Sequence, residues 1–311
     1  MSQTDPNKLK AALCCVGALA IWLGVTALFI GFRVEHVVLA VLIAVLFFAS
    51  NPTRRLIVAL VPFFLFGISY DWMNLCPNYN VNPVDVADLY NAEKRIFGIA
   101  YGGAMLTPNE FWALHTQPWL DVLCGIFYLC WVPVPIFFGL WLYFRGQKAS
   151  YLHFALVFLL VNLLGFSFYY VHPAAPPWYV ANHGFEAVPG TLGEVAGLGA
   201  FDRITGLNIF DGLYARNSNV FAALPSLHSA YTLVAFIYSL RSRCGLGWKI
   251  ALGIITVGIW FTAVYTSHHY IIDVLGGIAC ALVGFLLFEY ALMRIPAFNH
   301  FIARYVAYIK G

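Results

Sequence analysis

Long apolar segments recur along the whole chain and limit its fold more than any other feature. The chain has 311 residues, of which 61% are hydrophobic and only 10% are charged, whereas soluble domains are about a quarter charged. A helix needs about 20 apolar residues to cross the hydrocarbon core of a bilayer. We therefore expect an all-α, polytopic bundle of membrane helices with about eight apolar segments: 11–32, 36–50, 55–73, 118–144, 151–171, 223–241, 247–266 and 270–293.

Two long polar stretches, 74–117 and 172–222, interrupt these segments, and loops of this length are usually functional. Segment 36–50 is short enough to be tilted or re-entrant. We expect four regions: N-terminal membrane helices in 1–73, an extracytoplasmic loop in 74–117 with an amphipathic segment at 84–101, a main membrane domain in 118–295, and a cytoplasmic tail in 296–311.

The distribution of Lys and Arg predicts how the chain lies in the membrane. If the N-terminus is cytoplasmic, 12 of the 17 Lys and Arg residues fall in cytoplasmic segments, in agreement with the positive-inside rule. Both termini are then cytoplasmic. The twelve residues are Lys8, Lys10, Arg54, Arg55, Arg145, Lys148, Arg241, Arg243, Lys249, Arg294, Arg304 and Lys310.

Two histidine motifs fall on the predicted extracytoplasmic face: FAALPSLHSAY at 221–231 and YTSHHYIID at 265–273. Asp273 follows His269 by four residues, so we expect both on one face of a helix. The carboxylate can then hold one imidazole nitrogen and leave the other free to attack. With His228 as an acid, such a set suits phosphoryl transfer through a phosphohistidine. A lone histidine is often structural, but three ionisable groups at one membrane level favour a functional site.

His268 and His269 are adjacent, and helical geometry distinguishes them. His268 is five residues before Asp273, which would turn its side chain well away from the carboxylate. We therefore predict His269 as the nucleophile and His268 as a substrate contact or a structural residue. Ser226 follows Pro225 at an expected helix start, where backbone N–H groups bind phosphate readily.

The sequence Pro225-Ser226-Leu227-His228 resembles the second motif of the type-2 phosphatidic acid phosphatase superfamily, and His269-x-x-x-Asp273 resembles the end of its third. The resemblance implies a six-helix phosphatase-like core within 118–295. It also implies His269 as nucleophile, Asp273 as its partner and His228 as the acid. The chain departs from the family in having no Arg-Pro pair. Thr262 and Ala263 stand where the third motif has Ser-Arg, so the usual phosphate-binding cations are missing there.

Residues 172–280 are more specifically similar to inositol phosphorylceramide synthases, through APPWY at 175–179, FAALPSLH at 221–228 and HHYIID at 268–273. This likeness implies transfer of a phosphoinositol headgroup from a phosphoinositide to a ceramide-type hydroxyl, in a bacterial inner membrane or a Golgi membrane. Trp178 and Tyr179 are then substrate contacts, unless they are ordinary interfacial aromatic residues. Arg216 is the best candidate for a phosphate-binding cation, ahead of Arg203, Lys94 and Arg95.

Membrane lipids are the expected donor and acceptor, with no nucleic acid partner, and the oligomeric state stays open. No metal or other cofactor is expected, because the acidic residues show no clustered ligand pattern. Two other functions fit parts of the pattern. The same histidines would serve a phosphatase that hydrolyses lipid phosphates or diphosphates. A non-enzymatic membrane transporter would place polar residues along a path.

Overall fold

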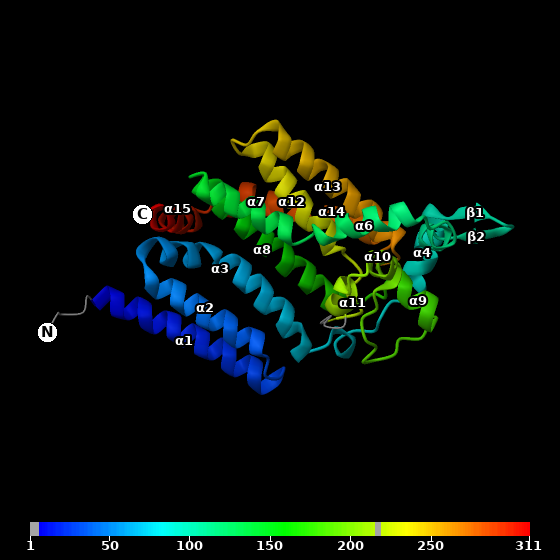
Figure 1. Cartoon of the computed structure of the whole chain (residues 1–311), viewed down its shortest axis with the longest axis horizontal. Helices are drawn as coiled ribbons and strands as arrows, with labels where there is room; N and C mark the ends of the chain where they lie inside the picture. Colours follow the sequence, from blue (N-terminus) through cyan, green and yellow to red (C-terminus); the bar gives the residue numbers. More distant parts are fainter. Residues whose placement is uncertain (1–5, 215–218) are drawn as a thin grey trace.

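The computed structural model describes residues 6–214 and 219–311 as an elongated bundle of helices (Figure 1). Helix α1, Pro6–Phe29, begins at the same end of the long axis as the C-terminus. The hairpin of β1, Ile99–Tyr101, and β2, Ala104–Leu106, lies at the other end. The predicted all-α membrane fold is confirmed. In the described part of the chain, the main helices are α1 Pro6–Phe29, α2 Val34–Ala49, α3 Asn51–Trp72, α6 Pro118–Leu129, α7 Pro133–Phe144, α8 Lys148–Val171, α12 Leu227–Arg241, α13 Leu246–Tyr265, α14 Ile271–Leu286 and α15 Pro296–Lys310.

Five helices of the described residues are long and apolar enough to cross a membrane, so the chain is a multi-pass membrane protein. The predicted apolar segment 118–144 contains two helices rather than one. It breaks into α6 and α7, which are bent by 44° relative to each other. Pro133 begins α7, as proline does at the first position of a helix, because its missing N–H costs nothing there. The five spans are Lys10–Phe29, Asn51–Leu75, Lys148–Val171, Leu246–Tyr265 and Ile271–Arg294.

Helix α8 is the centre of the bundle and contacts α3, α7, α12 and α14. Its fully buried residues include Phe154 and Phe158, and the Phe158 ring lies 4.7 Å from that of Tyr231 on α12. Helices α1, α2 and α3 form a layer in which only α3 has extensive contact with α8. Helix α3 therefore brings side chains of the N-terminal region against the core.

Residues 74–117, which we call the cap, contain α4 Ala87–Phe97, β1 Ile99–Tyr101, β2 Ala104–Leu106 and α5 Pro108–Leu114. The amphipathic segment predicted at 84–101 is helical only over α4, because the chain then turns into an antiparallel hairpin. Gly102 and Gly103 form its turn with positive φ angles, which glycine adopts without strain.

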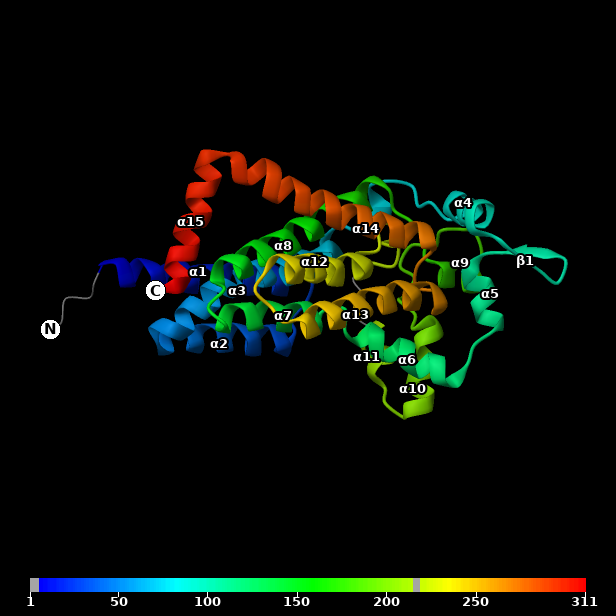
Figure 2. The same ribbon diagram turned by 90° about the horizontal axis from the view of Figure 1, so that it is seen from above.

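The chain between α8 and α12 contains the short helices α9 Pro177–His183, α10 Gly199–Thr205 and α11 Ile209–Tyr214. At the other end, α14 continues through a π-helical turn, η4 Leu287–Ala291, and a 3-10 turn, η5 Leu292–Arg294. The region predicted as a tail then forms α15, which crosses the end of the bundle (Figure 2). Its Tyr305 hydroxyl donates to the Val58 carbonyl of α3, so this segment is packed rather than extended.

Candidate active site

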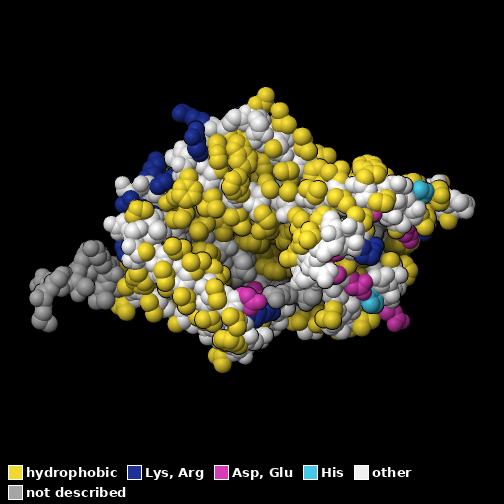
Figure 3. Space-filling view, in the orientation of Figure 1, with side chains coloured by type: hydrophobic (Ala, Val, Ile, Leu, Met, Phe, Trp, Pro, Cys, Tyr) yellow, Lys and Arg dark blue, Asp and Glu magenta, His cyan; other side chains and the backbone are white. Residues whose placement is uncertain are grey.

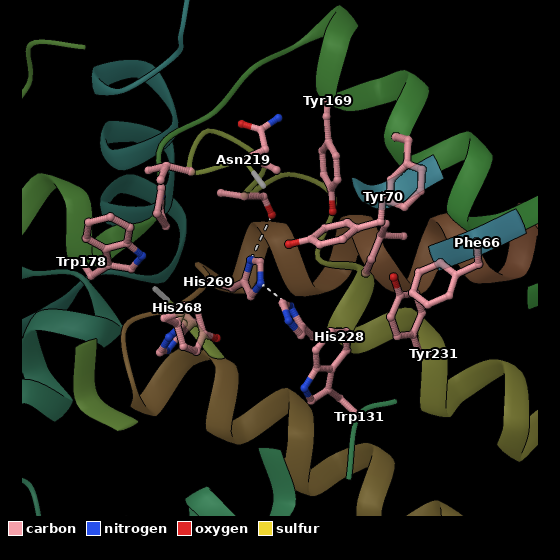
Figure 4. A pocket seen from close by; sticks show the side chains of 17 residues that line it. Phe66, Tyr70, Trp131, Tyr169, Trp178, Asn219, His228, Tyr231, His268 and His269 are labelled. Atoms are coloured by element: carbon pink, nitrogen blue, oxygen red, sulfur yellow. Dashed lines mark hydrogen bonds between the residues drawn. The ribbon is translucent and has the colours of Figure 1, made fainter. Parts of the chain in front are cut away.

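A pocket lies among α3, α8, α12 and the turn between α13 and α14 (Figure 4). The face seen in Figure 3 is largely hydrophobic and hollowed near its middle. Aromatic side chains and histidines dominate the pocket lining. The lining residues are Phe66, Tyr70, Trp131, Phe166, Tyr169, Pro176, Trp178, Tyr214, Asn219, Val220, Ala222, Ala223, Leu227, His228, Tyr231, His268 and His269.

The structure brings His228 and His269 together in this pocket. His228 is the second residue of α12, whereas His269 lies in the turn before α14. The Nδ1 atom of His228 lies 3.0 Å from the Nε2 atom of His269. The His228 ring is held against the rings of Trp131 and Tyr128, at centroid distances of 4.5 and 5.0 Å.

The second nitrogen of His269 determines its tautomer. Its Nδ1 atom lies 3.0 Å from the carbonyl oxygen of Ala223. Because a carbonyl oxygen only accepts hydrogen bonds, this Nδ1 carries a hydrogen. In neutral His269 the lone pair is therefore on Nε2, the nitrogen that faces His228. This is the nitrogen that can attack an electrophile in the pocket.

Asp273 lies close to His269, but not in the way that a shared helix predicts. Helix α14 begins at Ile271, so His269 precedes it and the two residues are not one helical turn apart. The Asp273 Oδ2 atom is 3.6 Å from Nδ1 of His269 and accepts a hydrogen bond of 2.8 Å from the backbone N–H of Tyr270. Asp273 thus caps α14 and places a fully buried carboxylate beside the imidazole.

The two histidine motifs are also joined through the backbone. The N–H of Ser226 donates to the carbonyl of Asp273 at 2.9 Å, which links the start of α12 to α14. At Gly277 of α14, an added Cβ atom would lie 2.0 Å from the carbonyl oxygen of Ser226. Glycine at this position is what allows the two helices to approach so closely.

His268 lines the same pocket, although helical geometry predicted that it turns away from Asp273. Its Nδ1 atom is 3.0 Å from the Thr266 hydroxyl, and its ring lies 4.7 Å from that of Tyr214. Burial lowers the pKa of His268 to about 3, so this imidazole is neutral at physiological pH. A neutral ring suits contact with an uncharged polar group better than binding of phosphate.

The other predicted substrate contacts are placed differently from one another. Trp178 lines the pocket and is anchored by its backbone N–H on the Ser267 carbonyl. Tyr179 does not line it, because its hydroxyl is engaged with the backbone of Glu186 and Val188. Ser226 is fully buried as the N-cap of α12, where its hydroxyl accepts from Ser229 rather than facing the pocket.

The predicted phosphate-binding cation Arg216 lies outside the described residues. Among the residues that the structure describes, the pocket lining contains neither Lys nor Arg, so the alternatives Arg203, Lys94 and Arg95 do not reach it. Hydrogen-bonding groups in the described lining come instead from tyrosines, Asn219, Trp178 and the histidines.

Sequence reasoning missed Phe66 and Tyr70 of α3, which face the histidines across the pocket in Figure 4. Two aromatic residues inside an apolar segment carry no signal that separates them from ordinary core residues. It also missed Glu93 and Asn109 of the cap, which bond to the backbone around His269. The only signal for Glu93 and Asn109 was a polar residue at a helical position that is expected to be buried.

Comparison with known proteins identifies the family of this chain. A match to the PAP2 superfamily covers residues 104–287, which include both histidine motifs. The chain is 57% identical to phosphoinositol dihydroceramide synthase of Bacteroides thetaiotaomicron over 305 residues, covering 98% of this chain and 100% of that protein. No solved structure matches the chain significantly.

Two fungal relatives match a smaller part. Inositol phosphorylceramide synthase of Candida albicans is 30% identical over 52% of this chain and 35% of its own length. The catalytic subunit of the same enzyme in Saccharomyces cerevisiae is 28% identical over 42% of this chain and 31% of its own. With the full-length bacterial match and the paired histidines, these findings show that the chain belongs to the inositol phosphorylceramide synthase-like branch of the PAP2 superfamily.

Proposed function

We propose that this enzyme transfers a phosphoinositol headgroup from a phosphoinositide to the hydroxyl of a ceramide-type lipid, through a phosphohistidine at His269. The observation that carries the proposal is the His228–His269 contact of 3.0 Å inside a pocket walled by membrane helices. The 57% identity to a phosphoinositol dihydroceramide synthase supports this choice of headgroup and acceptor.

In the first half of the reaction, the Nε2 lone pair of His269 attacks the phosphorus of the donor. The bond from phosphorus to the diacylglycerol oxygen breaks, and protonated His228 supplies the proton that this oxygen needs. His269 becomes positively charged as it bonds to phosphorus. The Ala223 carbonyl, which accepts from Nδ1, and the nearby Asp273 carboxylate stabilise that charge.

In the second half, the acceptor hydroxyl attacks the phosphohistidine. Neutral His228 takes the hydroxyl proton, and the bond between phosphorus and His269 breaks. The lone pair returns to Nε2, and His228 is again protonated for the next cycle. One phosphodiester is consumed and one is formed, so the chemistry needs no net hydrolysis.

The pocket walls support lipid substrates. Phe66 on α3 and Phe166 on α8 lie within candidate membrane spans and line the pocket. In Figure 4, Phe66 lies at the side opposite Trp178 and His268. Hydrocarbon chains can therefore lie against the aromatic side while the headgroup lies at the histidines. The single charge of a phosphodiester also fits a described lining without Lys or Arg better than a phosphomonoester would.

The Lys and Arg distribution supports cytoplasmic termini and an extracytoplasmic site. The start of α1 and the C-terminus lie at the end of the bundle opposite the cap (Figure 1). Under this orientation, the cap and both histidine motifs face the extracytoplasmic side.

The test is to incubate purified protein in lipid with phosphatidylinositol, with and without ceramide, and to identify products by mass. We expect inositol phosphorylceramide and diacylglycerol with ceramide present, and neither product with His269→Ala. Inositol phosphate formed equally with and without ceramide would overturn transfer and establish the hydrolase. Full biological activity of His269→Ala would contradict an enzyme and favour the transporter.

A further inference from the structure

A buried carboxylate of the cap holds the first turn of α14. Glu93 on α4 has no exposed surface. Its Oε1 atom accepts from the backbone N–H of Ile271 at 2.9 Å, and its Oε2 atom accepts from that of Ile272 at 3.1 Å. These are N–H groups that a helix leaves unpaired at its start, and a negative charge there is stabilised by the helix dipole.

A second cap residue holds the chain on the other side of the nucleophile. The side-chain amide of Asn109, on α5, donates to the carbonyls of His269 at 2.9 Å and Val264 at 2.8 Å. Asn109 is also buried. Residues 264–272 are therefore fixed at both ends by side chains of the cap, with His269 between them.

Movement of this turn would change the reacting geometry directly. Asp273 follows Ile272, whose backbone N–H is held by Glu93. The Oδ2 atom of Asp273 accepts from the Tyr270 N–H and also lies close to His269. Loss of the Glu93 bonds frees two N–H groups in a buried place and allows the turn to shift. A misplacement of about 1 Å can cost about a hundredfold in rate.

We propose that Glu93 is a positioning residue for phosphoryl transfer: its ionised carboxylate fixes the first turn of α14 and so the orientation of His269 and Asp273. The inference rests on the proposed function. Glu93 lies outside residues 104–287, the region matched by the superfamily, whereas Asn109 lies inside it.

Several titratable groups face Glu93. Asp273, in the first turn of α14, and Tyr270, just before this helix, interact electrostatically with Glu93. Tyr90 and Lys94 lie on the same helix as Glu93, and Glu110 on α5 accepts from Tyr90. Burial, with a smaller effect of the Asp273 charge, raises the pKa of Glu93 to about 7, against the opposing effect of the two backbone N–H groups. Protonation below that pH removes the charge from both hydrogen bonds, which weakens them. The positioning should therefore improve as the pH rises through neutrality.

The experiment compares Glu93→Gln with Asp88→Asn, a matched loss of charge at an exposed position on the same helix. In the transfer assay, we expect Glu93→Gln to lower kcat about 10- to 100-fold with little change in KM. In Asp88→Asn, we expect kcat to rise between about pH 6 and pH 8 as Glu93 ionises. We expect Glu93→Gln to lack this part of the rise. Equal kcat and equal pH profiles in the two variants would overturn the proposal.

Glu93→Asp keeps the charge but shortens the reach, and thermal unfolding checks that each variant is folded. We expect a kcat between those of Glu93→Gln and Asp88→Asn. If Glu93→Gln does not fold, Glu93→Asp decides the question, because a kcat equal to that of Asp88→Asn would overturn positioning. Failure of the wild type and Asp88→Asn to form product would count against the proposed function instead.

Discussion

The Nδ1 atom of His228 lies 3.0 Å from the Nε2 atom of His269, although 41 positions separate the two residues. The Ala223 carbonyl accepts from the other nitrogen of His269, so the nitrogen that faces His228 has the lone pair. The contact thus joins the proposed nucleophile to the proposed acid. A phosphodiester that enters between them would meet both groups at once.

Removal of the nucleophile should abolish turnover. We expect His269→Ala to lose at least about 10³-fold in kcat, because loss of a catalytic nucleophile leaves only binding and electrostatic effects. His300→Ala, a substitution of an exposed histidine on α15, should behave as wild type. Intact-protein mass with donor alone should show a phosphoinositol adduct on the wild type and none on His269→Ala. An adduct on the variant would exclude His269 as the attacking residue.

Asp273 should matter less to the chemistry than the nucleophile does, because Ala223 already holds the Nδ1 hydrogen of His269. Asp273→Asn keeps an oxygen that can accept from Tyr270 and removes the charge beside the imidazole. We expect about a 10- to 100-fold loss of kcat with normal folding, the range typical of side chains that orient a metal-bound histidine. Asp273→Ala also removes the acceptor for the Tyr270 N–H at the start of α14, so it should lower the unfolding temperature as well. Equal thermal stability of the two variants would contradict the capping role.

Much of this architecture could be predicted from sequence, because apolar runs and paired motifs are local signals. The break between α6 and α7 was missed, since Pro133 lies within a run that is apolar throughout. The position of His269 outside α14 was missed too, because four-residue spacing does not show where a helix begins. Contacts of Glu93 with Ile271 span 178 residues, and no local pattern indicates such a pairing.

The close approach of α12 and α14 should depend on Gly277. A methyl group there would lie 2.0 Å from the Ser226 carbonyl, which is backbone and cannot rotate away. We expect Gly277→Ala to destabilise the protein by about 1–3 kcal/mol, as overpacking usually does, and to lower kcat by moving His228. Gly253→Ala is the control, because its added methyl meets only the Phe236 ring, at 3.4 Å. Equal unfolding temperatures in the two variants would contradict this account.

The α3 wall of the pocket should affect lipid binding more than chemistry. Phe66 lines the pocket and packs against the rings of Phe158 and Tyr231. Phe66→Ala should raise KM for the lipid substrates about tenfold, with a smaller effect on kcat, because the lost contact is made before and during reaction alike. Leu65→Ala, at a more exposed position on the same helix, is the matched control. A change in kcat alone would place Phe66 in the chemistry instead.

The raised pKa of Glu93 also predicts how stability varies with pH. Its carboxyl ionises near its ordinary value of 4.5 in the unfolded chain and at about 7 in the folded one. Between these pH values the folded state therefore binds one more proton than the unfolded chain does. The stabilisation of the folded state by this proton is complete below about pH 4.5 and is lost as the pH rises through about 7. The unfolding temperature of the wild type should fall over that range relative to Glu93→Gln, while Asp88→Asn follows the wild type. Parallel curves for the wild type and Glu93→Gln would contradict the buried titration. Stability and turnover should thus respond to pH in opposite directions at this residue, because the ionised form that orients His269 is also the form that is costly to bury.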